Sequence, residues 1–268
     1  MIPLIQKTLG APYDFLKYAT PNSGKSRADK VIFFAFAPGA MEPSLCIKTT
    51  RSYEASEVIR LGFRNLQKLN ALTGVSAETS LFPRAVSLYD DGEHIFSVET
   101  AVPGQRERLT PEMLERVVRE YTRFQAQVAQ PKLQPVDAFA QELLSEELLR
   151  YYHTLPKSAL RLPRVLQLGD LTEDNLHFFP GGVAIVDFDR AGEFDLPGFD
   201  LVGLLRRYSK KEVRLLSQRY LPEYLRAIGA QGEGPYDRLL FLCHAAERLL
   251  RKGSGESAEA LIRGFENL

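Results

Sequence analysis

The order of local periodicities along the chain constrains the fold more than any other sequence feature. In the first hundred of the 268 residues, short runs rich in β-branched and aromatic residues predict strands at 13–18, 27–38 and 44–50. From Pro111 onward, apolar residues recur mainly at the three- to four-residue spacing of helices. Strands that precede helices, rather than alternate with them, predict an α+β fold with a β-rich lobe followed by a helix-rich lobe.

A helix and two further strands complete the predicted first lobe. The helix is expected at 53–72, from the apolar positions Val58, Leu61, Leu66, Leu69 and Leu72, and the strands at 81–90 and 94–102. Further helices are expected from Pro111, at 136–155 and over 200–208, 210–228 and 237–252. We therefore predict an N-terminal lobe at 1–98, a hinge at 99–105 and a C-terminal lobe at 106–268.

Charge and apolar content narrow the class of protein. Lys plus Arg total 34 and Asp plus Glu total 34, so no net charge favours binding to nucleic acid or to a membrane. The chain shows neither a signal peptide nor an apolar run of about 20 residues, which predicts a cytoplasmic protein without a membrane partner. Cys46 and Cys243 lie in apolar runs and are expected to be buried free thiols.

Residues 19–26, ATPNSGKS, differ by one conservative step from the P-loop signature G-x-x-x-x-G-K-[ST]. A P-loop must open a helix, because the helix N-terminus helps to bind the phosphates. The segment that follows, RADKVIFFAFAP, instead predicts a strand. We therefore expect residues 19–26 to form the tip of a β-hairpin, whereas a P-loop NTPase would require a helix there and a parallel sheet.

The segment 165–205 carries the residues best suited to chemistry. Asp170 and Asn175 precede a predicted hairpin with a PGG turn, and Asp187 follows its second strand, IVDFD. The two ends of a hairpin meet at one edge, so these oxygen-bearing side chains are expected to lie together. Carboxylate and amide oxygens suit Mg²⁺, which also takes phosphate oxygens.

The combined pattern G-D-x-x-x-x-N, I-V-D-F-D and D-x-P-x-x-D-L at 169–201 resembles the aminoglycoside phosphotransferase and choline kinase-like family. The resemblance covers nearly the whole chain and implies a two-lobed, protein-kinase-like fold. It implies an ATP- and Mg²⁺-dependent kinase that phosphorylates a hydroxyl group of a small molecule: a sugar, an amino alcohol or an aminoglycoside-like compound. The segment DLPGFDLVGLLRRYSKK is also similar to the spore-coat-associated branch of this family.

The resemblance also implies roles for single residues. Asp170 would orient the attacking hydroxyl or accept its proton, and Asn175 and Asp187 would hold magnesium at the ATP phosphates. Lys48 would contact the α- and β-phosphates. Asp200 would brace the catalytic loop.

The remaining implied nucleotide contacts lie in the first lobe and the hinge. The Thr100 carbonyl and the Val102 amide of the hinge would face adenine. Gly24 and Ser26, at the predicted hairpin tip, would lie near phosphate.

Two positions depart from the family pattern. Leu168 replaces the usual histidine before Gly-Asp, and Gly62 stands about where the helix of the first lobe normally carries an acid that pairs with the lysine. Glu54 and Glu57 are alternatives, either as partners of Lys48 or as solvent-facing charges. These departures leave open a second function: a kinase-like protein with little or no turnover and a binding or structural role.

Two further residues near the predicted site keep alternative interpretations. His177, in NLHFF, is interpreted as an ordinary strand residue rather than a metal ligand. Asp189 is either an additional carboxylate for the metal or a brace for the loop.

Overall fold

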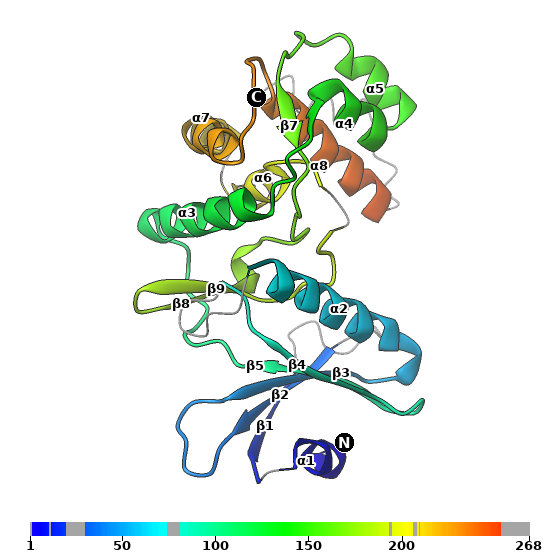
Figure 1. The fold of residues 1–268 in the computed structure, drawn as a ribbon, viewed down its shortest axis with the longest axis vertical. Coiled ribbons are helices and arrows are strands. Elements are labelled where there is room, and N and C mark those ends of the chain that lie inside the picture. The colour runs from blue at the N-terminus through cyan, green and yellow to red at the C-terminus, as the bar shows by residue number, and fades with distance from the viewer. Residues whose placement is uncertain are drawn as a thin grey trace. The chain divides into compact units, whose positions relative to one another are not determined.

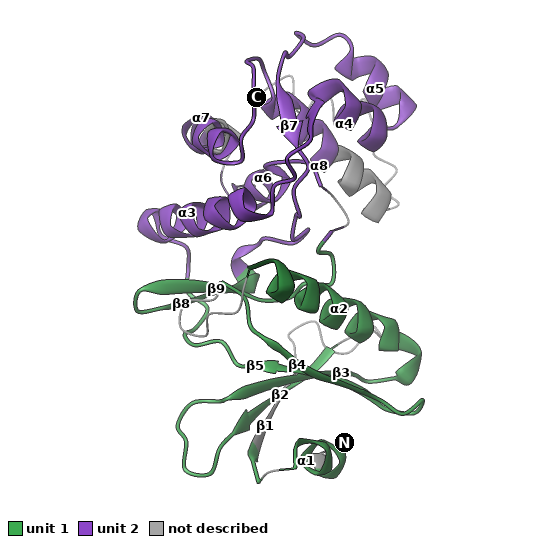
Figure 2. Ribbon diagram, in the orientation of Figure 1, with its two compact units in different colours: residues 1–107, 174–191 green, residues 108–173, 192–268 purple. Residues whose placement is uncertain are grey.

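The computed structural model describes residues 2–10, 12–19, 30–73, 81–192, 195–205, 208 and 210–252 (Figure 1). The chain divides into two compact units, unit 1 with residues 1–107 and 174–191 and unit 2 with residues 108–173 and 192–268 (Figure 2). Residues 174–191, which the sequence assigns to the C-terminal lobe, therefore pack with the β-rich N-terminal part. The hinge at 99–105 stays a prediction.

Unit 1 is built on a five-stranded antiparallel sheet with the strand order β1-β2-β3-β5-β4. Its elements are α1 (Ile2–Leu9), β1 (Asp14–Ala19), β2 (Lys30–Phe36), β3 (Leu45–Thr50), the 3-10 turn η1 (Tyr53–Ala55), α2 (Ser56–Thr73), β4 (Ala85–Asp90), β5 (Ile95–Thr100), β8 (Leu176–Phe179) and β9 (Gly182–Ile185). The predicted succession of three strands, one helix and two strands is confirmed. The sequence analysis did not predict α1.

The two faces of this sheet have different chemistry. On one face, Phe33, Ile47 and Val98 pack with Ile5 of α1 into a core that excludes water. Successive side chains of a strand point to opposite faces, so Lys48 lies on the other face. Helix α2 contacts β3, β4 and β5.

The P-loop interpretation of residues 19–26 is wrong. Strand β1 pairs with β2 in antiparallel register from Asp14↔Phe36 to Ala19↔Val31, and β2 already begins at Lys30. A P-loop would instead be followed by a helix that packs on a parallel sheet. The expected hairpin tip, with Gly24 and Ser26, lies outside the described residues.

Helix α2 turns a different stripe toward the sheet from the one expected. Ile59, Phe63, Leu66 and Leu69 are buried. Leu61 and Leu72, which were counted in the predicted stripe, are 36% and 52% exposed. The buried stripe keeps to the three- and four-residue steps of a helix, whereas the predicted set included a five-residue step that rotates away from the core.

Unit 2 is mainly helical, as predicted. Its elements are α3 (Pro111–Val128), β6 (Leu133–Pro135), α4 (Val136–Leu143), α5 (Glu146–Tyr152), β7 (Arg161–Pro163), α6 (Phe199–Leu205), α7 (Lys210–Ala227) and α8 (Asp237–Lys252). The Thr110 hydroxyl accepts a hydrogen bond from the Met113 N–H and so caps the N-terminus of α3.

The helix expected at 136–155 is two helices. Leu144 is extended, with φ −96° and ψ 141°, and ends α4. Ser145 then takes the N-cap position of α5, ahead of Glu146 and Glu147 in the first turn. Serine favours caps over helix interiors, which explains the break within an otherwise continuous helical pattern.

The β8–β9 hairpin is attached to unit 1 by backbone hydrogen bonds. Phe178 exchanges two of them with Gln105, of 2.9 and 3.1 Å, and the Ile185 N–H donates to the Leu81 carbonyl at 2.8 Å. A Cβ atom on Gly104 would lie 2.0 Å from the Phe178 oxygen, so this contact requires glycine.

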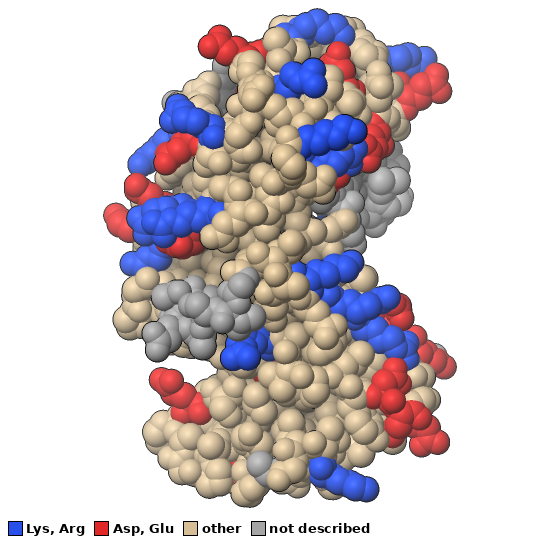
Figure 3. Space-filling model, viewed as in Figure 1, with Lys and Arg blue, Asp and Glu red and all other residues tan. Residues whose placement is uncertain are grey.

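On the face seen in Figure 3, acidic and basic side chains lie next to one another, mainly toward the edges of the view. This agrees with the formal net charge of zero. Among the helices that the structure describes, none is long and apolar enough to cross a membrane. Cys46 and Cys243 are free and buried, as predicted.

Candidate active site

The hairpin formed by β8 and β9 brings Asn175 and Asp187 to the same end. Leu176 pairs with Ile185, and the Val186 N–H donates to the Asn175 carbonyl at 3.0 Å. The Asn175 residue is 7% exposed, whereas 41% of the Asp187 side chain is exposed. The hairpin thus brings the backbones of Asn175 and Asp187 together, whereas the expected gathering of their side chains with that of Asp170 stays a prediction.

Asp187 has an unusual backbone conformation. Its φ of 70° makes it the one non-glycine residue with positive φ in the described part of the chain. This left-handed conformation is sterically costly, although aspartate tolerates it better than most residues, and such strain is concentrated at functional sites. Strand β9 ends at Ile185, two residues before this left-handed position.

Lys30 is the cation in contact with Asp187. Its Nζ atom lies 2.5 Å from Asp187 Oδ1 and 2.6 Å from Asp189 Oδ2, and its side chain is 14% exposed. The sequence analysis missed Lys30. It is the first residue of β2, and it lies 157 positions from Asp187, so no local pattern links the two.

Lys48 lies on the same face of the sheet as Lys30 but pairs with a different acid. It lies opposite Ile32 of β2, so Lys30 and Lys48 are diagonal neighbours on one face. Its Nζ atom lies 2.6 Å from Glu99 Oε1, with 13% of the Lys48 side chain and 6% of the Glu99 side chain exposed. Of the two lysines, Lys30 is thus the one that contacts Asp187.

Helix α2 supplies no acid to this cluster. A Cβ atom on Gly62 would lie 2.7 Å from Asp189 Oδ1, so the carboxylate packs directly against the helix where the family pattern has an acid. The Glu57 side chain is 65% exposed and pairs with Arg64 at 2.5 Å. Glu54 is exposed and accepts a hydrogen bond from Ser52. The acid bound to Lys48 is instead Glu99 of β5.

Asn65 connects α2 to the segment after β9. Its Nδ2 group donates to the carbonyl groups of Phe188 at 2.8 Å and Asp189 at 3.3 Å, and the residue is 4% exposed. These bonds position Asp189, which is therefore a structural brace as well as a partner of Lys30. Asn65, Lys30 and Glu99 are the residues of this cluster that sequence reasoning did not identify.

The two carboxyl groups beside Lys30 differ in acidity. Burial opposes ionisation of Asp187, but the charges of Lys30 and Lys48 outweigh it and lower the pKa of Asp187. Burial and the adjacent charge of Asp187 raise the pKa of Asp189. Asp187 is thus the carboxylate that stays ionised, as binding to a cation requires.

The side chains of this cluster are closely packed. Lys30, Lys48, Gly62, Glu99 and Asp189 line a cavity of about 10 Å³. A cavity of this size holds about one water molecule. The ammonium and carboxylate groups therefore interact directly.

Unit 2 contains the other predicted acids, Asp170 and Asp200. The Asp200 carboxylate, 2% exposed, accepts hydrogen bonds from the N–H groups of Leu168 at 2.5 Å and Gly169 at 2.9 Å. Tyr121 also donates to it, at 3.1 Å. The predicted role of Asp200 as a brace for the segment that leads into Asp170 is confirmed.

Leu168 is 1% exposed and fills its site without a polar contact of its side chain. Its neighbour Gln167, 0% exposed, accepts hydrogen bonds from the Tyr121 hydroxyl at 2.8 Å and the Asp200 N–H at 2.9 Å. Backbone and glutamine contacts thus hold the loop in place of the histidine that the family pattern carries.

In the described parts of the chain, no metal site is made by protein side chains alone. No group of three or more His, Cys, Asp or Glu residues suited to a metal ion occurs among the described residues. His177 Nδ1 is buried without a hydrogen-bond partner. Burial and the charge of Arg106 lower the pKa of His177, which favours its neutral form.

The predicted hinge residues follow β5. Thr100 ends the strand, and its N–H donates to the Arg84 carbonyl at 2.9 Å. The Ala101 N–H donates to the Ser44 carbonyl at 3.0 Å. The roles of Thr100 and Val102 toward adenine stay predictions.

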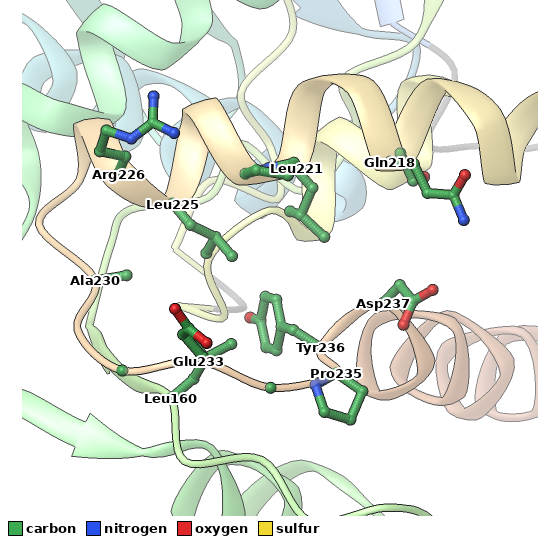
Figure 4. A pocket seen from close by; sticks show the side chains of 14 residues that line it. Leu160, Gln218, Leu221, Leu225, Arg226, Ala230, Glu233, Pro235, Tyr236 and Asp237 are labelled. Carbon is green, nitrogen blue, oxygen red and sulfur yellow. The ribbon is translucent and has the colours of Figure 1, made fainter.

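Unit 2 also contains a separate pocket of about 560 Å³ between α7 and the start of α8 (Figure 4). Leu221 and Leu225 on α7 face Tyr236 and Glu233 of the connecting segment across it (Figure 4). The Ser217 hydroxyl in its lining is buried and has no hydrogen-bond partner. None of the predicted catalytic or nucleotide-binding residues lines this pocket.

Comparison with protein families identifies the chain. Residues 70–241, more than half of it, match the model described as the phosphotransferase enzyme family. The chain belongs to this family. The aminoglycoside phosphotransferase and choline kinase-like resemblance is thereby confirmed. Comparison with curated protein sequences finds no match.

Solved structures of this phosphotransferase family have the same fold. Aminoglycoside phosphotransferase APH(3'')-Id of Streptomyces rimosus, described in complex with ADP and streptomycin, is 14% identical, with a TM-score of 0.55 over 92% of this chain and 96% of that one. A fructosamine-3-kinase from Thermobifida fusca, described as putative, is 14% identical, with a TM-score of 0.55 over 97% and 98%. The predicted α+β, protein-kinase-like fold is confirmed.

Proposed function

We infer that this phosphotransferase moves the γ-phosphate of ATP to a hydroxyl group of a small molecule. The observation that carries the inference is the charge cluster of unit 1. There, Asp187 lies in a left-handed turn in contact with Lys30, and Lys48 lies on the same sheet face. Phosphoryl transfer depends mainly on positioning and on compensation of phosphate charge, for which such a cluster is suited.

Asp187 and Asn175 are the proposed magnesium ligands. Mg²⁺ takes one or two protein oxygens and fills its octahedron with water and phosphate oxygens, so three clustered acids are not required. The Asp187 carboxylate already binds a cation, the Lys30 ammonium group, at 2.5 Å, which supports its fit to a metal ion. When bound, Mg²⁺ would neutralise the phosphate charge.

Asp170 is the proposed catalytic residue, which orients the acceptor hydroxyl or takes its proton. The proposal is supported by the hydrogen bonds from Leu168 and Gly169 to Asp200, which fix the backbone just before Asp170. The Asp170 residue is partly exposed, which is compatible with contact to an acceptor.

The other predicted nucleotide contacts are carried forward as parts of the same proposal. Lys48 would contact the α- and β-phosphates, and Thr100 and Val102 would bind adenine. Gly24 and Ser26, outside the described residues, would lie near phosphate. A cytoplasmic location and membership of the spore-coat-associated branch also stay predictions.

The acceptor is proposed to be an aminoglycoside, a sugar or an amino alcohol. The solved relatives described with streptomycin or as a fructosamine kinase support this range of hydroxylated compounds. Their low identity to this chain does not favour one acceptor over another.

A kinase-like protein without turnover is the second candidate function. Gly62 and Leu168, which depart from the family pattern, favour it. The Glu99 contact with Lys48 weighs against it, since the lysine has an acidic partner despite Gly62.

The test compares Asp187→Ala, Asp170→Asn and, as a matched control, Asp174→Asn, an exposed acid in the same segment. Calorimetry measures MgATP affinity, and ATP consumption is followed with a panel of sugars, amino alcohols and aminoglycosides. Asp187→Ala should weaken MgATP binding at least about tenfold, because phosphate charge loses its metal ligand. Asp170→Asn should keep that affinity and lower turnover by roughly two to four powers of ten.

Two outcomes would contradict this proposal. Equal loss of MgATP binding in the Asp170 and Asp187 variants would refute the division of roles. Absence of MgATP binding by the wild-type protein at millimolar concentration would exclude the kinase and favour the binding protein.

A further inference from the structure

We propose that Lys30 is a nucleotide-binding residue whose ammonium group binds the terminal phosphates, while Glu99 positions Lys48 for the inner phosphates. This inference rests on the proposed function. It assigns two lysines from neighbouring strands, Lys30 and Lys48, to the phosphate groups of one nucleotide. The family resemblance had implied only one lysine, Lys48, paired with an acid on the helix of the first lobe.

The partners of the two lysines distinguish their roles. Lys48 pairs with Glu99, whose side chain is 6% exposed, so this ion pair is enclosed by the sheet and α2. Lys30 pairs with Asp187 and Asp189, whose side chains are 41% and 25% exposed. Lys30, itself 14% exposed, is therefore bound to the more solvent-exposed carboxyl groups of the cluster.

The position of the lysines on the sheet fits one extended anion. Diagonal neighbours on an antiparallel pair of strands lie about 7–8 Å apart, a separation that two or three linked phosphate groups can span. Lys30 and Lys48 are such neighbours, since Lys48 lies opposite Ile32. Lys30 is the one in contact with Asp187, the proposed metal ligand, and so would meet the phosphates that the metal binds.

The charge balance suggests what happens to the ion pairs of Lys30 when the nucleotide binds. One ammonium group contacts two carboxyl groups, at 2.5 and 2.6 Å, so acidic oxygens are the partners that a nucleotide would replace. A metal–nucleotide complex would take over the Asp187 oxygen and provide new anionic partners for the ammonium group. The four-carbon stem of lysine allows this exchange without movement of the strand.

Glu99 takes over the positioning role that an acid on α2 would have. A side chain at position 62 would have to displace Asp189, because a Cβ atom there would lie 2.7 Å from Asp189 Oδ1. Glu99 lies on β5 next to Lys48, opposite Cys46 of β3. The acid thus comes from a strand of the same sheet and is fixed by the strand register.

The experiment measures binding of AMP, ADP and ATP with Mg²⁺ by calorimetry for Lys30→Met, Lys30→Arg and Lys68→Met. Lys68 is an exposed lysine of α2 and serves as the matched control for loss of one positive charge. Lys30→Met should weaken ATP binding at least tenfold and leave AMP binding within threefold, and Lys30→Arg should recover part of the ATP affinity. Lys68→Met should bind all three nucleotides as the wild type does.

A second readout uses the metal alone. In Lys30→Met, Asp187 and Asp189 no longer contact the lysine ammonium group. This variant should therefore bind Mn²⁺ at least threefold more tightly than the wild type, as measured by electron paramagnetic resonance. A lysine that only stabilised the fold would give no such opposite changes in Mn²⁺ and ATP affinity. Should Lys30→Met fail to fold, Lys30→Gln carries the same expectations.

The outcomes separate this inference from the proposed function. If the wild type binds MgATP and Lys30→Met binds it within threefold of the wild type, the role of Lys30 is refuted and the kinase proposal stands. If the wild type binds no nucleotide, both are refuted. A loss that is equal for AMP and ATP would also refute the assignment of Lys30 to the terminal phosphates.

Discussion

The Lys48 ammonium group lies 2.6 Å from the Glu99 carboxylate inside unit 1, with 13% and 6% of the two side chains exposed. Their strands pair directly, with Lys48 opposite Ser97 and Cys46 opposite Glu99. Removing two charges from water is costly, and their attraction offsets that cost only while both are present. The pair should therefore behave as one unit.

Removal of one partner is expected to destabilise the protein strongly. Lys48→Met should lower the free energy of unfolding by about 3–5 kcal/mol, because the Glu99 charge would remain buried without a partner. The double variant Lys48→Met, Glu99→Leu should recover most of this loss, as measured by urea denaturation. Additive losses in the double variant would show that the two side chains are not coupled.

The effect of Gly62→Ala on the stability of the protein is expected to depend on Asp189. Alanine usually stabilises a helix interior by roughly 0.5–1 kcal/mol relative to glycine. In the wild-type background, a Cβ atom at position 62 would lie 2.7 Å from Asp189 Oδ1 and displace a carboxylate that Lys30 binds, so Gly62→Ala should give little or no gain.

The control for this prediction is the same substitution in an Asp189→Ala background. There the crowding is absent, and Gly62→Ala should stabilise the protein by the full roughly 0.5–1 kcal/mol in thermal unfolding. An equal effect of Gly62→Ala in both backgrounds would mean that Asp189 does not limit the space at position 62.

The two thiols should be unreactive in the native protein. Burial, followed by the charge of Glu99, raises the pKa of Cys46 to about 12, and burial raises the pKa of Cys243. At pH 9, roughly one Cys46 thiol in a thousand would be ionised, and the thiolate is the reactive form. A colorimetric disulfide reagent at pH 9 should therefore label neither residue until denaturant is added, and then label both. Rapid labelling without denaturant would contradict the burial of these residues.

Local features of the sequence predicted the order of the helices and strands and the part of the candidate site at the β8–β9 hairpin. The β8–β9 hairpin joins residues close in sequence, so Asn175 and Asp187 were correctly expected at its open end.

The partners of the lysines depend on contacts that no local pattern contains. Lys30 and Asp187 are 157 positions apart in the sequence. Likewise, the Asp189 side chain, which follows the β8–β9 hairpin, packs against the distant Gly62 of helix α2. Periodicity gives the face of an element but not the distant element that packs against it. A signal for Glu99 did exist: it is an acid within an apolar strand, and a buried acid requires a partner.

The hydrogen bonds of Asp200 lead to the last prediction. Its two carboxylate oxygens accept separately, Oδ2 from the Leu168 N–H at 2.5 Å and Oδ1 from the Gly169 N–H at 2.9 Å. An asparagine side chain has one acceptor oxygen and one NH₂ group, which is a donor. In Asp200→Asn, one of the two buried N–H groups would therefore face the NH₂ group and lose its hydrogen bond. Such an unsatisfied group typically costs about 1–3 kcal/mol.

Asp200→Asn should therefore loosen the segment before Asp170. We expect faster hydrogen exchange at the Leu168 and Gly169 amides, together with a loss of stability of about 1–3 kcal/mol. Tyr121→Phe is the matched control, because it removes a hydroxyl donor of the same buried network, 3.1 Å from Asp200, and leaves both backbone bonds intact. Tyr121→Phe should leave the exchange at these two amides close to that of the wild type. If both variants accelerate exchange equally, the segment is held by the buried network as a whole, and the two Asp200 bonds have no separate role in fixing the backbone that presents Asp170.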